Sequence, residues 1–329
     1  MINYNARIRN FNKGKNKINK DILIIGAGRW GKVLLSEIAK NFINIKKIYI
    51  FTGYQDSLKK WVKKNKYKNV FILKKFSETK KIKSCFSLIA NKNKDHFRYC
   101  YKLLNQGYNV LIEKPFILNL EQSNKLIKLS GYKKLFLLIG LQFFYANYLY
   151  YIKDKIIKKS IIKSINFEWF DEKNKKRNNV LKKHDLSVKY IEDIFYHAYS
   201  ILYILLGKNS FKFNKKISNT NKIEKLKFEY HSREIVINCS RNWSCRKRIL
   251  KINFYNGKSL LINFSKDNQI KVKLNDKIIN VPINYCAKTI KYQLFSFFKL
   301  KNYQSNKAIN DIRNLKNLLE GLKGLRKQY

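Results

Sequence analysis

The sequence predicts an α/β N-terminal domain built on a doubly wound parallel sheet, followed by an α+β C-terminal domain with an open antiparallel sheet. Three observations carry this prediction. A short apolar run, Ile22–Ile25, leads directly into the pattern Gly26-x-Gly28-x-x-Gly31 and then into a helical pattern. Short strands and helices then alternate as far as residue 143, which indicates βαβ units. From residue 211 to residue 281, strand follows strand.

The glycine pattern at the first strand–helix junction is typical of the dinucleotide-binding turn of a Rossmann domain. Gly26 would make the tight turn, Gly28 would let backbone approach a pyrophosphate, and Gly31 would let the helix pack closely on the strand. The N-terminus of the helix offers unpaired N–H groups and a positive dipole end to phosphate. The alternative is a glycine-rich turn without a ligand.

The other elements of the first domain follow from apolar runs and capping residues. Gly107 is expected to end the helix before it, because glycine readily adopts the left-handed conformation common at helix C-termini. Asn119 is expected to cap the next helix with its side-chain oxygen. Strands are predicted at Lys47–Phe51, Asn69–Leu73, Cys85–Ala90, Tyr108–Ile112 and Leu135–Leu141, with helices at about Asp56–Lys64, Asp95–Leu104 and Asn119–Leu129.

The second domain has a different order of elements. It is expected to contain a helix near Asn147–Lys159, an extended stretch at Ile162–Asp171, a charged loop at Glu172–Lys183 and a helix at about Val188–Leu206 that Gly207 stops. Strands between Phe211 and Val281 are divided by turns at 256–257 and 275–276, and helices at about Tyr285–Phe298 and Asn310–Arg326 close the chain. The predicted division is a basic disordered lead-in (1–20), a dinucleotide-binding domain (21–143) and a substrate and oligomerisation domain (144–329). The final helix is a candidate to pack back on the dinucleotide-binding domain.

Composition limits the classes of function. The formal net charge of +50 invites a nucleic-acid interpretation, but only 11 of the 71 basic residues are Arg and the lysines are spread over the whole length. Lys, Asn, Ile, Tyr and Phe are enriched together, which indicates codon bias, so no specific nucleic-acid partner is expected. Leu135–Ile152 is 18 residues without a charge, and we interpret it as a buried strand leading into a helix in a soluble protein.

The cysteines and histidines bear on the cellular compartment of the protein and on metal binding. The five cysteines are odd in number and form no CxxC pair, so we expect free thiols in a reducing, cytoplasmic compartment. Residues 1–20 are polar and basic, without the apolar core of a secretory signal. His184 and His231 have no partners at metal-ligand spacing, so no metal is expected.

The end of the second predicted strand bears on the choice of cofactor. A carboxylate there commonly holds the ribose 2′-OH of NAD. Here the strand ends in Thr52-Gly53, and the next acidic residue is Asp56. Lys59 or Lys60 could approach a 2′-phosphate. The cofactor is therefore NAD or NADP, with a slight preference for NADP.

Two further stretches, Ile89–His96 and Gln106–Phe116, give the chain a family resemblance. Together with the glycine pattern, the run Gly-Tyr-Asn-Val-Leu-Ile-Glu-Lys-Pro (107–115) resembles the glucose–fructose oxidoreductase/inositol dehydrogenase (Gfo/Idh/MocA) family of NAD(P)-dependent oxidoreductases. The resemblance implies that Lys114 lies beside nicotinamide and substrate, and that the protein associates through its C-terminal sheet as a homo-oligomer. The implied cofactor-binding residues are Gly26, Gly28, Arg29, Trp30, Gly31, Thr52, Ala90, Asn91, Asn93, His96, Glu113 and Lys114. For His96, a structural hydrogen bond is the competing interpretation.

The family's second catalytic motif, Asp-x-Gly-x-His-x-x-Asp, has a counterpart at residues 193–200. Asp193 and His197 are four residues apart and share a helix face. The implied catalytic residues are thus Lys114, His197 as general acid/base and Asp193 as its orienter or a substrate contact. Gln142, Lys189 and Tyr196 are the candidate substrate-binding residues. The competing interpretation of Asp193 and His197 is a helix-face ion pair plus a core histidine.

Three departures from the family pattern bear on the substrate. Phe195 replaces the glycine, Ser200 replaces the second Asp, and Phe144 stands where many members carry an arginine. The resemblance implies that the missing polar groups contact sugar hydroxyls, so their loss argues against a typical sugar or inositol substrate. The surrounding aromatic residues would suit a flatter or more apolar substrate, and codon bias is the competing explanation for them. The expected substrate is a small metabolite that is sugar-like or more apolar. The alternatives are a member that binds cofactor without catalysis and a charge-driven polyanion-binding protein, whose affinity salt would weaken steeply if the contacts were nonspecific.

Overall fold

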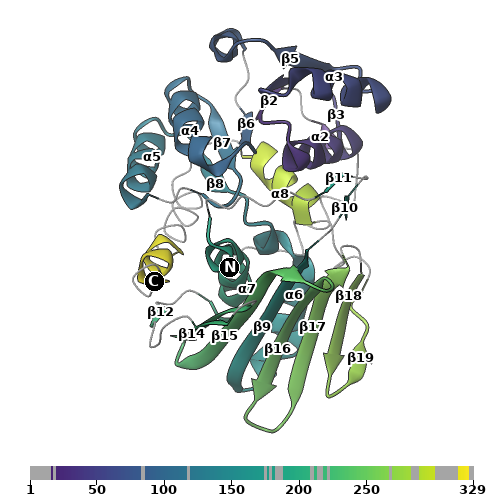
Figure 1. The fold of residues 1–329 in the computed structure, drawn as a ribbon, viewed down its shortest axis with the longest axis vertical. Coiled ribbons are helices and arrows are strands. Elements are labelled where there is room, and N and C mark those ends of the chain that lie inside the picture. Colours follow the sequence, from purple (N-terminus) through teal and green to yellow (C-terminus); the bar gives the residue numbers. More distant parts are fainter. Residues whose placement is uncertain are drawn as a thin grey trace. The chain divides into compact units, whose positions relative to one another are not determined.

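The computed structural model describes residues 16–17, 20–82, 86–116, 119–173, 176–177, 180–181, 188–207, 211–212, 218–220, 223–266, 269–282, 289–300 and 318–325. The chain divides into two compact units. The first unit comprises Met1–Gln142 and Ile290–Arg313, and the second comprises Phe143–Thr289 and Asn314–Tyr329. Each unit contains its own large sheet (Figure 1).

The sheet of the first unit has six parallel strands in the order β5-β4-β2-β6-β7-β8. These are β2 (Ile22–Ile25), β4 (Ile48–Phe51), β5 (Val70–Leu73), β6 (Phe86–Ile89), β7 (Asn109–Ile112) and β8 (Leu137–Ile139). In chain order this is third, second, first, fourth, fifth, sixth, so the predicted doubly wound sheet is confirmed. The order reverses between β2 and β6, and ligands of such sheets bind beyond the carboxyl ends of the strands at this point.

Helices follow the strands of the first unit as expected. They are α2 (Arg29–Asn41), α3 (Gln55–Lys64), α4 (His96–Asn105) and α5 (Leu120–Tyr132), with 3-10 turns η1 (Phe76–Lys81) and η2 (Asn93–Asp95). Gly107 ends α4 with φ +87°, as predicted. The predicted cap of α5 is also present, because the Gln122 N–H donates to Asn119 Oδ1 over 3.0 Å.

A helix from the far end of the chain, α8 (Thr289–Phe298), completes the core of the first unit. Its Leu294, Phe297 and Phe298 lie in one buried cluster with alternate residues of β2, β4 and β6 and with the inner faces of α2 and α3. The Phe297 ring meets the Phe86 ring at 5.1 Å in an edge arrangement. The predicted helix began at Tyr285, and residues 283–288 lie outside the described part of the chain.

The predicted lead-in is described only at its end. Asn16–Lys17 form a short strand, β1, that pairs in parallel with β3 (Phe42–Ile43). The predicted disorder therefore does not extend to these two residues, because β3 offers them backbone hydrogen bonds. Residues 1–15 and 18–19 lie outside the described part of the chain.

The second unit is built on a nine-stranded sheet with the order β12-β14-β15-β9-β16-β17-β18-β19, in which β13 also pairs with β14. The strands are β9 (Ile162–Glu172), β12 (Phe211–Lys212), β13 (Ser218–Thr220), β14 (Ile223–Tyr230), β15 (Arg233–Trp243), β16 (Lys247–Phe254), β17 (Ser259–Lys266), β18 (Gln269–Leu274) and β19 (Lys277–Ile279). The helices are α6 (Asn147–Lys155) and α7 (Tyr190–Leu206), with turns η3 (Gln142–Tyr145) and η4 (Ile157–Lys159). Residues 318–325 are also helical.

Two details of the second unit differ from the prediction. The sheet is mixed, because β9 and β15 pair in parallel while the remaining neighbours are antiparallel. Between β9 and β15 the chain passes through α7 and β14, and such a crossover lets it return in the same direction. The predicted loop at 172–183 also contains a two-stranded pair, β10 (Lys176–Arg177) with β11 (Val180–Leu181).

The uncharged segment Leu135–Ile152 forms β8, η3 and the start of α6. It is therefore a strand followed by a helix, as predicted. Among the residues that the structure describes, no helix is both long enough and apolar enough to cross a membrane.

Candidate functional site

The glycine loop lies between β2 and α2 at the reversal point of the parallel sheet. Gly26 has φ +98°, and a Cβ placed on it would lie 2.7 Å from the backbone nitrogen of Asn91. A Cβ on Gly31 would overlap the carbonyl oxygen of Gly26. Around Gly28, by contrast, nothing lies within 4 Å of such a Cβ, and α2 begins at the next residue without a side-chain cap. Two glycines are thus required by packing, and the third leaves open space at a helix N-terminus.

Backbone hydrogen bonds bring the ends of the neighbouring strands together. The N–H of Gly26 donates to Phe51 O, that of Ala90 to Ile25 O, and that of Glu113 to Ile89 O, each over 2.8 Å. We call the residues that directly follow β2, β4, β6, β7 and β8 the carboxyl edge: Gly26, Thr52, Ala90, Glu113 and Gly140. The edge therefore contains predicted cofactor residues from four separate strands.

Three buried polar atoms near the carboxyl edge have no hydrogen-bond partner among the described residues. They are Trp30 Nε1, Asn91 Oδ1 and Glu113 Oε1. Glu113 is only 6% exposed, and a Cβ on Gly140 would lie 2.6 Å from its Oε2. Buried polar atoms are normally paired, so these three are suited to groups that a ligand brings.

Burial also perturbs the carboxyl group of Glu113. It raises the pKa of Glu113 from 4.5 to about 7. The indole N–H of Trp30 and the charge and backbone of Lys114 lower this pKa and offset part of the effect. A hydrogen-bonding interaction with Trp30 thus contributes to the pKa of Glu113, although Trp30 Nε1 and Glu113 Oε1 lie outside strict hydrogen-bond geometry. Together with the open space at Gly28, these residues fit a dinucleotide in chemical character.

Asn93 and His96 join the loop after β6 to the turn after β7. Asn93 Nδ2 donates to Pro115 O over 2.7 Å, and His96 Nδ1 lies 3.0 Å from the same oxygen. His96 Nε2 lies 3.2 Å from Asn91 O, and the ring is 1% exposed. The structural hydrogen bond that competed with a cofactor role for His96 is therefore present. The cofactor contacts of both residues stay predictions.

Lys114 occupies the turn that these bonds hold. It follows Glu113 at the carboxyl end of β7, is partly exposed, and precedes Pro115 through a cis peptide bond. Arg29, the first residue of α2, lies beside Gly28, and Gln142 begins η3 after β8. The first unit therefore contains the predicted cofactor residues, Lys114 and Gln142.

The remaining predicted residues lie on α7 in the second unit. Lys189 is at the N-cap position and exposed, Asp193 is in the first turn and partly exposed, and His197 is 8% exposed. The imidazole of His197 stacks on the Trp169 ring, with centroids 5.2 Å apart and an interplanar angle of 23°. The Phe143 ring meets it edge-on at 5.2 Å. Contacts with these two aromatic rings thus restrict the orientation of the His197 imidazole.

The sequence analysis did not identify Trp169. Its position was readable from the alternation of β9, which places Phe167, Trp169 and Asp171 on one buried face. What could not be read was the guanidinium of Arg248, 4.8 Å from the centre of the indole ring. Arg248 Nη2 also donates to Asp171 Oδ1 over 2.7 Å. The buried indole beneath His197 is thus supported by an ion pair between two strands.

The first unit matches a known protein family. Residues 20–141 match the model of the Gfo/Idh/MocA oxidoreductase family, described as an NAD-binding Rossmann fold. The matched region includes the glycine loop, all six parallel strands and the turn that carries Lys114. This Rossmann domain belongs to the Gfo/Idh/MocA family. Residues 20–141 therefore match an oxidoreductase family whose members carry an NAD-binding Rossmann fold.

Solved structures with a similar fold cover both units. A 3-ketoreductase from Actinomadura kijaniata, in complex with NADP and TDP-benzene, is 12% identical with a TM-score of 0.75, and covers 94% of this chain and 97% of its own. The UDP-N-acetylglucosamine 3-dehydrogenase of Acidithiobacillus ferrooxidans is 15% identical with a TM-score of 0.67, covering 92% and 96%. A dehydrogenase from Clostridium difficile is 16% identical with a TM-score of 0.66, covering 92% and 99%. At these identities the comparisons establish a shared fold.

The departures from the Gfo/Idh/MocA motif occupy core positions of the second unit. The Phe195 ring is fully buried and packs edge-on against Phe228 of β14 at 5.9 Å. Ser200 Oγ donates to the carbonyls of Tyr196 and His197 within the same helix. Tyr196 and Tyr199 are also fully buried. These aromatic side chains serve helix packing, so they do not support the expectation of a more apolar substrate.

Proposed function

We propose that the protein transfers a hydride between C4 of a nicotinamide cofactor and a carbon that bears a hydroxyl or carbonyl oxygen in a small metabolite. The observation that carries this proposal is the set of unpartnered buried atoms, Trp30 Nε1, Asn91 Oδ1 and Glu113 Oε1, beside the glycine loop. They lie where the parallel sheet reverses its order, which is the ligand-binding position of this fold. Lys114 follows one of them directly.

The proposed cofactor contacts follow from the first unit. When bound, the nicotinamide cofactor would supply or accept the hydride. Gly26, Gly28 and the first turn of α2 would bind the pyrophosphate through backbone N–H groups. Trp30 and Glu113 would bind polar groups of the cofactor, which would give their buried atoms the partners that the described residues lack.

The proposed proton handling rests on three side chains. The Lys114 ammonium would donate a hydrogen bond to the substrate oxygen and stabilise negative charge that develops on it. His197 would exchange the proton of the hydroxyl as general acid/base, because imidazole titrates near neutral pH. Asp193, one helical turn before it, would orient the ring or contact substrate. The predicted substrate contacts are Gln142, Lys189 and Tyr196. Tyr196 is fully buried, which disfavours a contact between its side chain and the substrate.

For the substrate class we propose a polyhydroxylated, sugar-like ring. Among proteins of similar fold, one is named as a UDP-N-acetylglucosamine dehydrogenase and another as a 3-ketoreductase. Both names describe chemistry at a carbon bearing oxygen. We also propose a cytoplasmic location on the basis of the free thiols of Cys100, Cys239 and Cys245.

Titration with NADH and NADPH tests the binding step. Trp30 lies in the first turn of α2, so its emission should be quenched as the nicotinamide cofactor saturates the protein. Lys114→Ala should retain cofactor binding and lose turnover of any sugar or sugar nucleotide that the wild type oxidises or reduces. Absence of binding at millimolar NADH and NADPH would refute the proposal.

A second candidate is a protein that binds the cofactor without catalysis. The observation that favours it is the burial of Phe195 and Ser200, which stand where the family motif has Gly and Asp. It predicts saturable NAD(P)H binding with no turnover across a panel of sugars, inositols and sugar nucleotides. Turnover that depends on both Lys114 and His197 would exclude it.

A further inference from the structure

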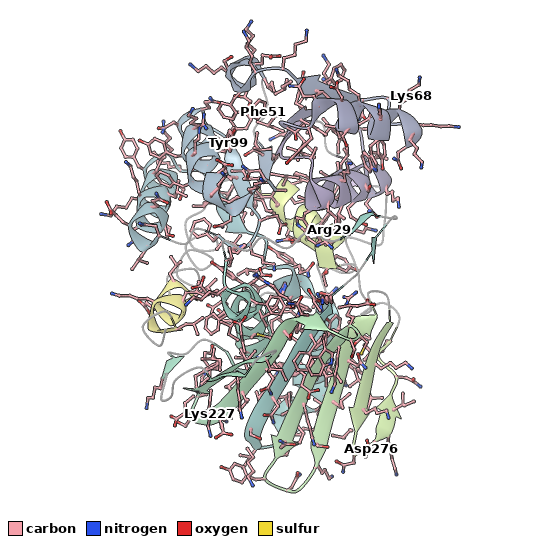
Figure 2. All side chains as sticks on the ribbon, viewed as in Figure 1. Arg29, Phe51, Lys68, Tyr99, Lys227 and Asp276 are labelled. Carbon is pink, nitrogen blue, oxygen red and sulfur yellow. The ribbon has the colours of Figure 1, made fainter. Side chains whose placement is uncertain are left out.

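Three aromatic rings form a cluster at the carboxyl end of β4. Phe51 is the last residue of β4, Phe76 is the first of η1, and Tyr99 lies in the first turn of α4. Their ring centroids are 5.5 Å (Phe51–Phe76), 5.9 Å (Phe51–Tyr99) and 5.1 Å (Phe76–Tyr99) apart. Phe51 and Tyr99 lie near each other in the first unit (Figure 2). All three side chains are partly exposed. This aromatic cluster is therefore a surface feature rather than part of the core.

The aromatic cluster is adjacent to the glycine loop. The carbonyl oxygen of Phe51 accepts the hydrogen bond from the Gly26 N–H over 2.8 Å. Ile48 and Ile50 of the same strand point into the core cluster shared with α2, α3 and α8, so Phe51 is on the opposite face of the sheet. The end of this strand is where the fold receives the adenosine half of a dinucleotide.

Positive charge surrounds the aromatic cluster. The guanidinium carbon of Arg98 lies 5.5 Å from the centre of the Tyr99 ring, and Lys102 Nζ lies 5.5 Å from that of Phe76. Two acidic side chains nearby in sequence are engaged elsewhere. Asp56 pairs with Lys59 at 3.2 Å. Glu78 Oε1 accepts a hydrogen bond from the backbone N–H of Lys75 over 2.6 Å.

The turn after β4 lacks the group that would repel a phosphate. Thr52 Oγ1 accepts the Tyr54 N–H over 3.2 Å, and Gly53 follows it. A ribose 2′-hydroxyl therefore meets no carboxylate from this turn. Arginine binds phosphate through two parallel hydrogen bonds, and a purine stacks well on exposed aromatic rings.

We propose that the aromatic cluster binds the adenine of the cofactor and that Arg98 pairs with a 2′-phosphate on its ribose, so that the chain prefers NADP to NAD. This inference rests on the proposed function, because it places one end of the proposed cofactor. Arg98 is the proposed partner of the 2′-phosphate rather than Lys59, because the Lys59 ammonium already pairs with Asp56.

The test compares adenosine 2′,5′-bisphosphate with 5′-AMP, which differ only by the 2′-phosphate, by calorimetry on the full chain. The wild type should bind the bisphosphate at least about tenfold more tightly, the effect of one charge-assisted contact. Arg98→Gln should remove most of this preference and leave 5′-AMP affinity unchanged. Tyr99→Leu should weaken both ligands by roughly tenfold, because both stack their adenine. Lys125→Gln is the matched control, because Lys125 Nζ lies 5.1 Å from the ring of Tyr101, also on α4.

The outcomes separate this inference from the proposed function. Equal affinity of the wild type for the two nucleotides, or an unchanged preference in Arg98→Gln, overturns the inference while NADH binding still supports the function. Failure of the wild type to bind any of NADH, NADPH and the two nucleotides overturns both. Circular dichroism establishes whether Tyr99→Leu is folded, and Arg98→Gln changes an exposed side chain and tests the phosphate contact independently.

Discussion

Replacing Glu113 by Gln should change how the stability of the first unit depends on pH. Burial raises the pKa of Glu113 from 4.5 to about 7. Between these two values the folded state retains the proton and the unfolded state does not, so the free energy of unfolding falls as pH rises. The difference of about 2.5 in pKa corresponds to about 3 kcal/mol once both states are ionised. Gln keeps the shape of the side chain and has no charge to desolvate.

Urea unfolding of the protein without cofactor, at several values between pH 4.5 and pH 8, measures this effect. Emission of the four tryptophans follows unfolding of both units, and Trp30 and Trp61 contribute the signal of the first unit. Relative to wild type, Glu113→Gln should gain up to about 3 kcal/mol as pH rises through this window. Glu121→Gln, which removes an exposed carboxylate on α5, should leave the pH dependence of wild type in place. If wild type and Glu113→Gln give parallel curves, the carboxyl group of Glu113 is not destabilised by burial and the reasoning fails.

Three further predictions concern the two units. Gly28→Ala should leave the thermal midpoint unchanged, because a Cβ at this position meets only open space. It should weaken NADPH binding in a fluorescence titration, because the methyl group would occupy the space proposed for the pyrophosphate. Gly31→Ala should lower the thermal midpoint, because its Cβ overlaps the backbone of Gly26. Arg248→Met should destabilise the second unit by about 3 kcal/mol in urea, since it leaves the carboxylate of Asp171 buried without its cation, and adding Asp171→Asn should recover much of the loss. Among the three cysteines in the described part of the chain, Cys245 is exposed and should react with a disulfide reagent before the buried Cys100 and Cys239, whose pKa values burial raises.

Local sequence was sufficient for the part of the cofactor site that depends on backbone geometry. A buried strand, a tight turn and a helix N-terminus each depend on a few adjacent residues. The strand Ile22–Ile25 and the glycine loop could therefore be predicted from the local sequence. The same holds for the left-handed Gly107 and the cap at Asn119, because each is decided within a few residues. The apolar runs of the other parallel strands were equally clear.

Contacts between distant segments could not be read in this way. The core of the first unit includes α8, although its residues follow β8 by about 150 positions, as in the bond from Gln293 Nε2 to Ile139 O. Arg248 and Asp171 are 77 residues apart and meet only because β9 and β16 are neighbours. The parallel pairing of β9 with β15 likewise depends on the route of the chain through α7 and β14.

The sequence by itself therefore determined the elements, the nucleotide-binding turn and the family of the first unit, because these follow from hydrophobic period and from the backbone preferences of glycine and asparagine. Only the tertiary structure decided that His96 bonds to backbone carbonyls, that Phe195 and Ser200 are core residues, and that His197 stacks on Trp169. The physical reason is that the partners of a side chain are set by which distant segments pack beside it, and packing depends on the whole chain rather than on neighbouring residues.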